Sequence, residues 1–173
     1  PRPVTEQALI EHWGAAAEKA EVLARLCHGG IGWAISALSD ERLLEERGQK
    51  LERLISLHDA GIEQRFAYAA QLATQFAKNR DSVREELELW RGWCRDLLLT
   101  RAGCAKLVAN IDREALLHRQ ARRYSLTEIK GFIKAIGAAL QQLEQNANPQ
   151  LVLEVLMLAL PLEGARERKA RYA

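Results

Sequence analysis

The 173-residue chain has little proline and little histidine, four of each, and its eleven glycines are scattered. It also lacks the strict alternation of apolar and polar residues that a half-buried strand requires. Leu, Ala, Glu and Arg dominate instead, a composition that is typical of helical bundles. The sequence therefore predicts an all-α fold, and its length allows one domain or two small ones.

Cysteine, net charge and long apolar runs are also scarce. The three cysteines, Cys27, Cys94 and Cys104, are odd in number and lack metal-ligand spacing, which favours a reduced, cytoplasmic compartment. The net charge of +2 is too small to indicate a nucleic acid or a membrane by itself. The ten-residue apolar run at 151–160 is too short to span a bilayer, and no signal peptide is present. Because residue 1 is not methionine, we expect a fragment of a longer protein.

Signatures of catalysis are missing as well. Without a glycine-rich phosphate loop that ends in Lys-Ser or Lys-Thr, the chain alone is not expected to hydrolyse a nucleotide in that manner. Cys27 and His28 would need two further metal ligands that the sequence does not place nearby. Cys94 lies on an apolar helix face, and Cys104 follows a glycine without an identifiable base. The acidic residues at 40–46 are typical of a solvated helix face. We therefore predict no catalytic and no metal-binding residue.

The strongest pattern lies in residues 125–161, a long amphipathic helix followed by a turn and a second, almost wholly apolar helix. Ser125 and Glu128 have the spacing of a capping box, and apolar residues then recur every three or four positions. Pro149 suits the first turn of the second helix and restricts the residue before it. That helix has one charge in positions 151–160. A helix that is apolar on every side must be covered on every side, so we expect other subunits to supply part of the cover.

The rest of the chain is predicted as further helices. Two prolines favour an extended lead-in over 1–4, with Thr5 as the first helix cap and Ser39 or Asp40 as a later one. Ser82 to Glu85 has the pattern of a second capping box, and Asp112 is placed to cap another helix. The predicted helices before the strongest pattern cover about 5–13, 15–27, 31–38, 40–57, 62–78, 82–100 and 112–123.

Two groups of basic residues are candidates for phosphate contact. The first consists of Arg119, Arg122, Arg123, Lys130 and Lys134. Because few aromatic residues, Tyr124 among them, are interleaved with this group, a solvated helix end is the simpler explanation. The second group lies in the C-terminal tail, which we expect to be loose because it has no apolar periodicity. It consists of Arg166, Arg168, Lys169 and Arg171.

A glycine-rich turn at residues 29–34 is the most position-specific feature of the first part of the chain. Its glycines allow a helix start to approach neighbouring backbone, or a phosphate group, very closely. A tight turn between two helices explains the same residues equally well.

Three segments resemble subunits of bacterial clamp loaders. Residues 23–34 resemble the lid, in which a helix ends in a Gly-Gly-Ser-Pro-Gly-Arg-Ala-like turn. Residues 146–151 and the apolar helix after them resemble the last two helices of the collar domain. Residues 93–99 with 109–112 resemble the middle of that domain. The chain is most similar to the delta-prime class of DNA polymerase III subunits, with the amino-terminal AAA+ nucleotide-binding module absent.

The resemblance implies a small three-helix lid over 1–58 and a helical-bundle collar over 59–173. In such loaders five subunits form a ring whose collars pack together, and the AAA+ modules load the sliding clamp onto DNA with ATP. The implied partners are gamma/tau and delta subunits, with the clamp and primer–template DNA as indirect partners. The resemblance also implies that this chain is not an enzyme and holds no cofactor, because ATP binds to other parts of the complex.

Two sets of residues follow from the same resemblance. A lid turn near a nucleotide would consist of Gly30, Gly32 and Trp33. ATP-hydrolysing relatives offer an arginine to the phosphates where Trp33 stands, and an indole cannot neutralise phosphate charge, which favours a non-hydrolysing subunit. The subunit interface in the collar would consist of Leu151, Val152, Val155, Leu156 and Leu158. The alternatives are a gamma/tau-type ATPase subunit and a nucleic-acid-binding helical domain that uses Arg119, Arg122 and Arg123.

Overall fold

The computed structural model describes residues 2–27 and 29–161, and within these ranges every regular element is a helix. The all-α prediction is therefore confirmed. The α-helices are α1 (Arg2–Trp13), α2 (Ala17–Leu26), α3 (Ile31–Ser39), α4 (Arg42–Asp59), α5 (Ile62–Lys78), α6 (Arg80–Arg101), α7 (Glu114–Arg123), α8 (Leu126–Glu144) and α9 (Pro149–Leu158). Two short 3₁₀ helices, η1 (Ala105–Leu107) and η2 (Ile111–Arg113), lie between α6 and α7.

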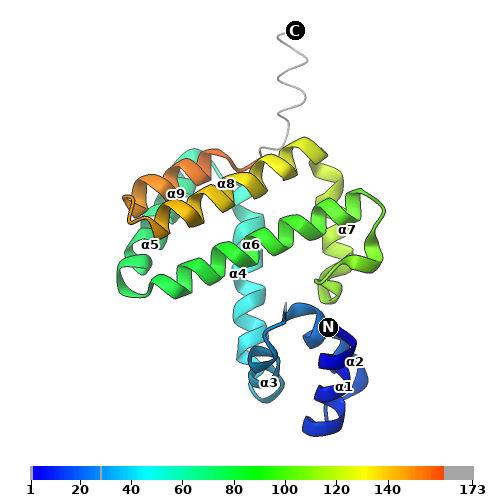
Figure 1. Cartoon of the computed structure of the whole chain (residues 1–173). Helices are drawn as coiled ribbons and strands as arrows, with labels where there is room; N and C mark the ends of the chain where they lie inside the picture. The colour runs from blue at the N-terminus through cyan, green and yellow to red at the C-terminus, as the bar shows by residue number, and fades with distance from the viewer. Residues whose placement is uncertain (1, 28, 162–173) are drawn as a thin grey trace.

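The described residues pack around two separate hydrophobic clusters. The smaller cluster joins α1, α2 and α3 around Leu9 and Leu23, both fully buried. The larger cluster fills the bundle of α5 to α9 around Trp90, Trp93 and Phe132. Figure 1 shows the small unit below the bundle, with α8 lying along α6 and α9 beside α5 and α8. Both tryptophans are buried, so they belong to the core.

Helix α4 belongs to both parts. Leu43 and Leu44, near its start, pack against the smaller cluster, whereas Leu51, Leu54 and Leu57 are buried in the larger one. In Figure 1 this helix runs upward from the small unit into the bundle. Because one continuous helix contributes to both cores, no loop marks the change from one core to the other. The predicted division into 1–58 and 59–173 remains a prediction.

The first helix begins earlier than the two prolines suggest. Helix α1 starts at Arg2, so the predicted extended lead-in is wrong for the described residues, and Thr5 lies inside the helix rather than at its cap. The physical reason is that proline has no N–H to lose in the first turn, where that group has no intrahelical acceptor. The helix ends at Trp13, as predicted, and Gly14 follows it with a φ of +65°.

Two other predicted helix starts are also wrong, and a third is close. Helix α6 is capped by Asn79, whose side chain accepts a hydrogen bond from Ser82 N at 3.1 Å, so Ser82 lies in the first turn. Asp112 lies in η2, and α7 begins at Glu114 without a side-chain cap. Helix α4 begins at Arg42, and Asp40, one of its two predicted caps, accepts a hydrogen bond from Arg42 N through Oδ1 at 3.1 Å. Where the predicted start is wrong, several polar residues lie close together, and the sequence alone does not rank them as caps.

The capping box of α8 is confirmed. Ser125 Oγ accepts from Glu128 N at 3.2 Å, and Ser125 N donates to Glu128 Oε2 at 2.7 Å. Helix α8 ends at Glu144, and Asn146 then adopts a φ of +60° that turns the chain back. The turn between α8 and α9 therefore has the position that the sequence predicts.

Candidate subunit interface

Helix α9 is fixed at its start by local chemistry. Pro149 is its first residue, and the side chain of Asn148 accepts a hydrogen bond from Leu151 N at 3.2 Å. This contact satisfies one of the N–H groups that a helix start leaves without a partner. The apolar helix therefore begins where the sequence predicts.

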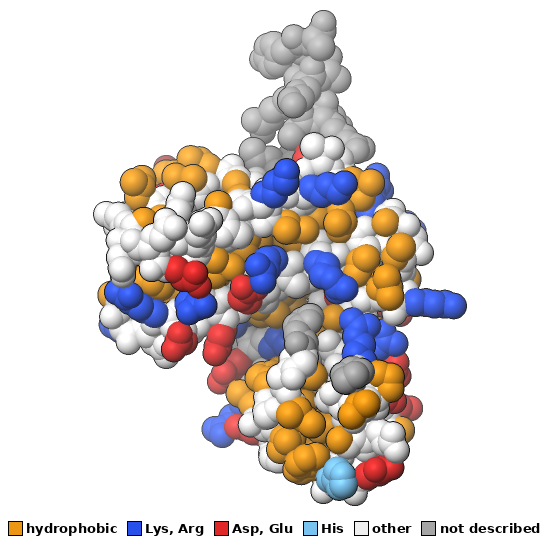
Figure 2. All heavy atoms as spheres, viewed as in Figure 1, with side chains coloured by type: hydrophobic (Ala, Val, Ile, Leu, Met, Phe, Trp, Pro, Cys, Tyr) orange, Lys and Arg blue, Asp and Glu red, His pale blue; other side chains and the backbone are white. Residues whose placement is uncertain are grey.

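The two faces of α9 differ sharply in exposure. Val152, Leu153, Leu156 and Met157 are buried in the larger hydrophobic cluster, as is Leu160 just after the helix. On the opposite face, Leu151, Val155 and Leu158 are 60%, 56% and 60% exposed. These three positions have the i, i+4, i+7 spacing of one helix face. Figure 2 shows hydrophobic side chains gathered over α9, at the upper left of the view. We call Leu151, Val155 and Leu158 the α9 stripe.

The structure divides the five residues predicted for the interface. Leu151, Val155 and Leu158 lie on the exposed face, whereas Val152 and Leu156 are 6% and 2% exposed and pack inside the chain. The face of α9 that carries Val152 and Leu156 packs within the chain, and α5 and α8 contact the helix, so the cover that we expect from other subunits concerns the opposite face. An almost uniformly apolar helix gives no periodicity from which to choose the inward face.

A buried arginine joins the end of α9 to the end of α4. Arg65, on α5, is 3% exposed. Its Nε and Nη2 donate to the carbonyls of Leu57 and His58 at 2.9 and 3.0 Å. Its Nη1 lies 3.4 and 3.5 Å from the carbonyls of Met157 and Leu160. One guanidinium therefore contacts the last turns of two helices.

His58 makes a second contact between the same two helix ends. Its ring is 5% exposed, lies 4.9 Å from the ring of Tyr124 between centroids, and has Nδ1 3.2 Å from the carbonyl of Pro161. Burial lowers the pKa of His58 to about 4, with the nearby charge of Arg65 acting in the same direction. The imidazole is therefore neutral at neutral pH and donates its Nδ1 hydrogen to that carbonyl.

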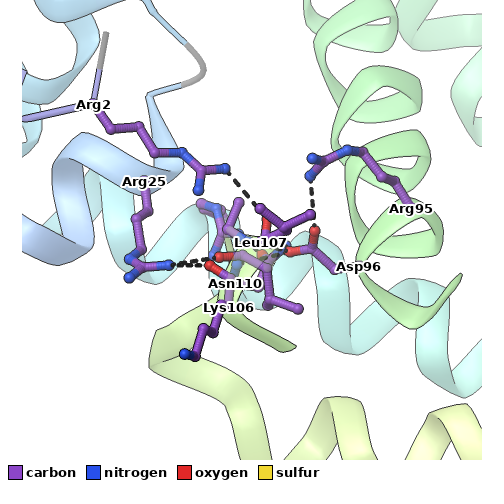
Figure 3. A network of polar contacts seen from close by, with 10 residues as sticks. Arg2, Arg25, Arg95, Asp96, Lys106, Leu107 and Asn110 are labelled. Atoms are coloured by element: carbon purple, nitrogen blue, oxygen red, sulfur yellow. Dashed lines mark hydrogen bonds and ion pairs between the residues drawn. The ribbon is translucent and has the colours of Figure 1, made fainter. Parts of the chain in front are cut away.

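A polar joint connects the small helical unit to the bundle (Figure 3). Arg25, on α2, donates to the carbonyls of Lys106 and Val108 at 3.3 and 3.1 Å. Arg2, on α1, donates to the carbonyl of Leu107 at 3.4 Å. Both arginines reach the loop that follows α6, so this joint is made of hydrogen bonds to backbone, while the hydrophobic clusters meet at α4.

Asp96, on α6, forms hydrogen bonds to the loop that these arginines contact. This carboxylate is fully buried and accepts hydrogen bonds from Ala109 N, Asn110 N and Asn110 Nδ2 at 2.8, 2.8 and 2.6 Å (Figure 3). Arg95 pairs with its other oxygen at 3.1 Å. Neither Asp96 nor Arg65 is among the residues that the sequence singles out. A signal was available, because each is a charged residue within the apolar stripe of its helix.

The predicted lid turn lies at the start of α3. Gly29 has a φ of +94°, which favours glycine, and a Cβ at Gly30 would lie 3.2 Å from the carbonyl of Cys27. A Cβ at Gly32 would meet nothing within 4 Å. Trp33 is half-buried against the smaller hydrophobic cluster. The close approach at Gly30 is thus to neighbouring backbone, and a nucleotide contact at Gly30, Gly32 and Trp33 remains a prediction.

The basic residues are not equivalent. Arg119 and Arg122 are exposed on α7, whereas Arg123 forms an ion pair with Asp59. Lys130 and Lys134 are exposed on α8. The basic residues of the tail, at 166–171, lie outside the described residues. A phosphate-binding role for any of these side chains remains a prediction.

Within the part of the chain that the structure describes, no group of three His, Cys, Asp or Glu side chains is placed to hold a metal ion, and no helix is long and apolar enough to cross a membrane. Cys94 is buried, as its place on an apolar helix face predicts, and burial raises the pKa of its thiol to about 12, while Cys104 is exposed. A hollow of about 440 Å³ between α4 and α5 is lined by Ser56, Asp59 and Tyr68, among others.

Comparison with known proteins gives one family match. The model of the family described as "DNA polymerase III, delta subunit, C terminal" matches residues 42–161. No curated protein and no solved structure matches the chain. The matched segment begins with the first residue of α4 and includes α5 to α9, and therefore the whole bundle that carries the α9 stripe. Because this match covers well over half of the sequence, the chain belongs to the family of carboxy-terminal domains of DNA polymerase III delta subunits, which are components of the clamp loader.

Proposed function

We propose that this chain holds the pentameric clamp-loader ring together through its collar bundle, and so supports ATP-dependent loading of the sliding clamp onto DNA. The observation that carries the proposal is the α9 stripe, three large aliphatic side chains that remain more than half exposed on one helix face. Neighbouring collars of gamma/tau and delta-type subunits are the proposed cover. The chain itself contributes contacts rather than chemistry.

The stripe is large enough to matter to an interface. Full burial of a Leu or Val side chain contributes about 1.5–3 kcal/mol. Leu151, Val155 and Leu158 retain close to 60% of their exposure, so covering all three would contribute roughly 3–5 kcal/mol. The core of a protein–protein interface is more apolar than its rim, and an exposed aliphatic face of this kind suits that core.

The test is ring assembly with a charged stripe. We expect the Leu158→Glu chain, co-expressed with gamma/tau and the remaining clamp-loader subunits, to keep its helicity but to elute apart from the ring in size-exclusion chromatography. Leu107→Glu is the matched control, since Leu107 is also exposed, at 51%, but lies in η1. Normal incorporation of the Leu158→Glu chain would show that the stripe is not the interface.

Within the loader, we propose the delta-prime class. The support is the resemblance of the lid turn, in which Trp33 stands where hydrolysing relatives have an arginine. A reconstitution experiment distinguishes the classes. The labelled chain is added to two mixtures of loader subunits, one that lacks delta and one that lacks delta-prime. Restoration of the ring only where delta-prime is missing is the expected result, and restoration only in place of delta would assign the chain to that class.

Two other functions give different results in simple assays. A gamma/tau-type ATPase subunit would show nucleotide-dependent ring assembly that depends on the lid turn. A nucleic-acid-binding domain would bind DNA with an affinity that falls steeply with salt, and Arg119→Ala with Arg122→Ala would weaken that binding. The exposure of both arginines is the observation that favours this second candidate.

A further inference from the structure

Arg65 occupies a position where its helix otherwise presents apolar residues to the core. Ala69, Leu72 and Phe76 follow it on the buried face of α5. A charged side chain that is only 3% exposed needs hydrogen-bond partners for its N–H groups, and the acceptors that Arg65 contacts are backbone carbonyls. Three of these carbonyls belong to the last turns of α4 and α9, and the fourth, that of Leu160, lies just after α9. The position of Arg65 is therefore defined by two helix ends at once.

The chemistry of this contact suits a guanidinium. The last four carbonyls of a helix have no partner within the helix, and together they carry a partial negative charge. A planar guanidinium presents five N–H donors in a rigid fork, so it can donate in two directions at the same time. An ammonium group carries the same charge but is a single point, and it cannot reach both helix ends together.

The two helices that meet at Arg65 connect to different parts of the molecule. Helix α4 begins at the smaller hydrophobic cluster, whereas α9 carries the exposed stripe. His58 adds a contact from α4 to the carbonyl of Pro161, just beyond α9. The end of α9 is therefore held by hydrogen bonds to groups on α4 and α5 as well as by apolar packing.

We propose that Arg65 is a positioning residue for the α9 interface, because it fixes the end of the stripe-bearing helix to the helix that runs in from the small unit. This inference rests on the proposed function of the α9 stripe. As a consequence, the orientation in which the α9 stripe faces a partner subunit is set by the position of α4. Loss of the guanidinium would leave α9 packed but free to fray from its carboxyl end.

Hydrogen–deuterium exchange on the whole chain tests the proposal. In Arg65→Met we expect the amides of residues 155–160 to exchange about tenfold faster than in the wild-type chain, with smaller changes in α6 and α8. Asp96→Asn is the control, since it alters another buried charged side chain whose partners lie in the loop after α6. Arg65→Lys is measured in parallel, and we expect it to show the same local effect at α9.

The outcomes separate this proposal from the proposed function. Unchanged exchange at 155–160, or equally faster exchange throughout the bundle, would overturn the positioning role, and failure of both Arg65 variants to fold would do the same. A selective increase at α9, together with at least tenfold weaker incorporation of Arg65→Lys into the ring, would support it. Exchange in the free chain does not depend on what the stripe binds, so normal assembly of Leu158→Glu would refute the proposed function without affecting this measurement.

Discussion

Mild acid should destabilise this chain through the buried side chain of His58. His58 is 5% exposed and has a pKa of about 4 because burial disfavours the imidazolium. In the unfolded chain the same ring has its ordinary pKa of 6.5, so the unfolded state binds the proton first as the pH falls. The stability that depends on a neutral His58 is therefore complete above about pH 6.5 and is lost progressively as the pH falls towards 4.

The magnitude follows from these two pKa values. Over the whole range the loss is about 3 kcal/mol, at about 1.4 kcal/mol for each pH unit between 6.5 and 4. Between pH 7.5 and pH 5.5 the unfolded state gains about a tenfold statistical advantage, or roughly 1.4 kcal/mol. This narrower interval is the better one to measure, since most carboxylates titrate below it.

Urea denaturation followed by circular dichroism at the two pH values is a direct assay. We expect the free energy of unfolding of the wild-type chain to fall by about 1.4 kcal/mol, whereas His58→Gln, whose amide can still donate to the carbonyl of Pro161, should lose much less. His118→Gln, which removes an exposed histidine on α7, should behave like the wild-type chain. The reasoning is refuted if His58→Gln and the wild-type chain show the same pH dependence.

Two further predictions concern α9 and the start of α6. Leu153→Ala should lower the free energy of unfolding by about 2–5 kcal/mol because Leu153 is fully buried, whereas Leu151→Ala should change it by less than about 0.5 kcal/mol. Urea denaturation of both variants checks which face of α9 is buried, and equal losses of stability would contradict the orientation described above. Asn79→Ala should cost about 1 kcal/mol in the same assay because Asn79 caps α6, and a larger loss for Ser82→Ala than for Asn79→Ala would place the cap at Ser82 instead.

The sequence was sufficient for features that depend on neighbours along the chain. The helices α1 to α9 could be expected from apolar periodicity, and the capping box at Ser125 and the helix start at Pro149 from contacts within four residues. The same local reasoning was wrong at Thr5, Ser82 and Asp112. There, several residues could each start the helix, and the free-energy differences between such caps are only about 1 kcal/mol.

The residues that matter most to the proposed interface could not be found from local sequence patterns. Helix α9 is apolar on nearly every side, and only its packing against α5 and α8 leaves Leu151, Val155 and Leu158 exposed while Val152 and Leu156 are buried. Arg65 likewise contacts carbonyls 92 and 95 residues further along the chain. Apolar periodicity and helix capping depend on residues within a few positions of one another, so they can be recognised directly in a sequence. Which face is covered, and which carbonyls a buried charge meets, depends on distant segments that come together only in the folded chain.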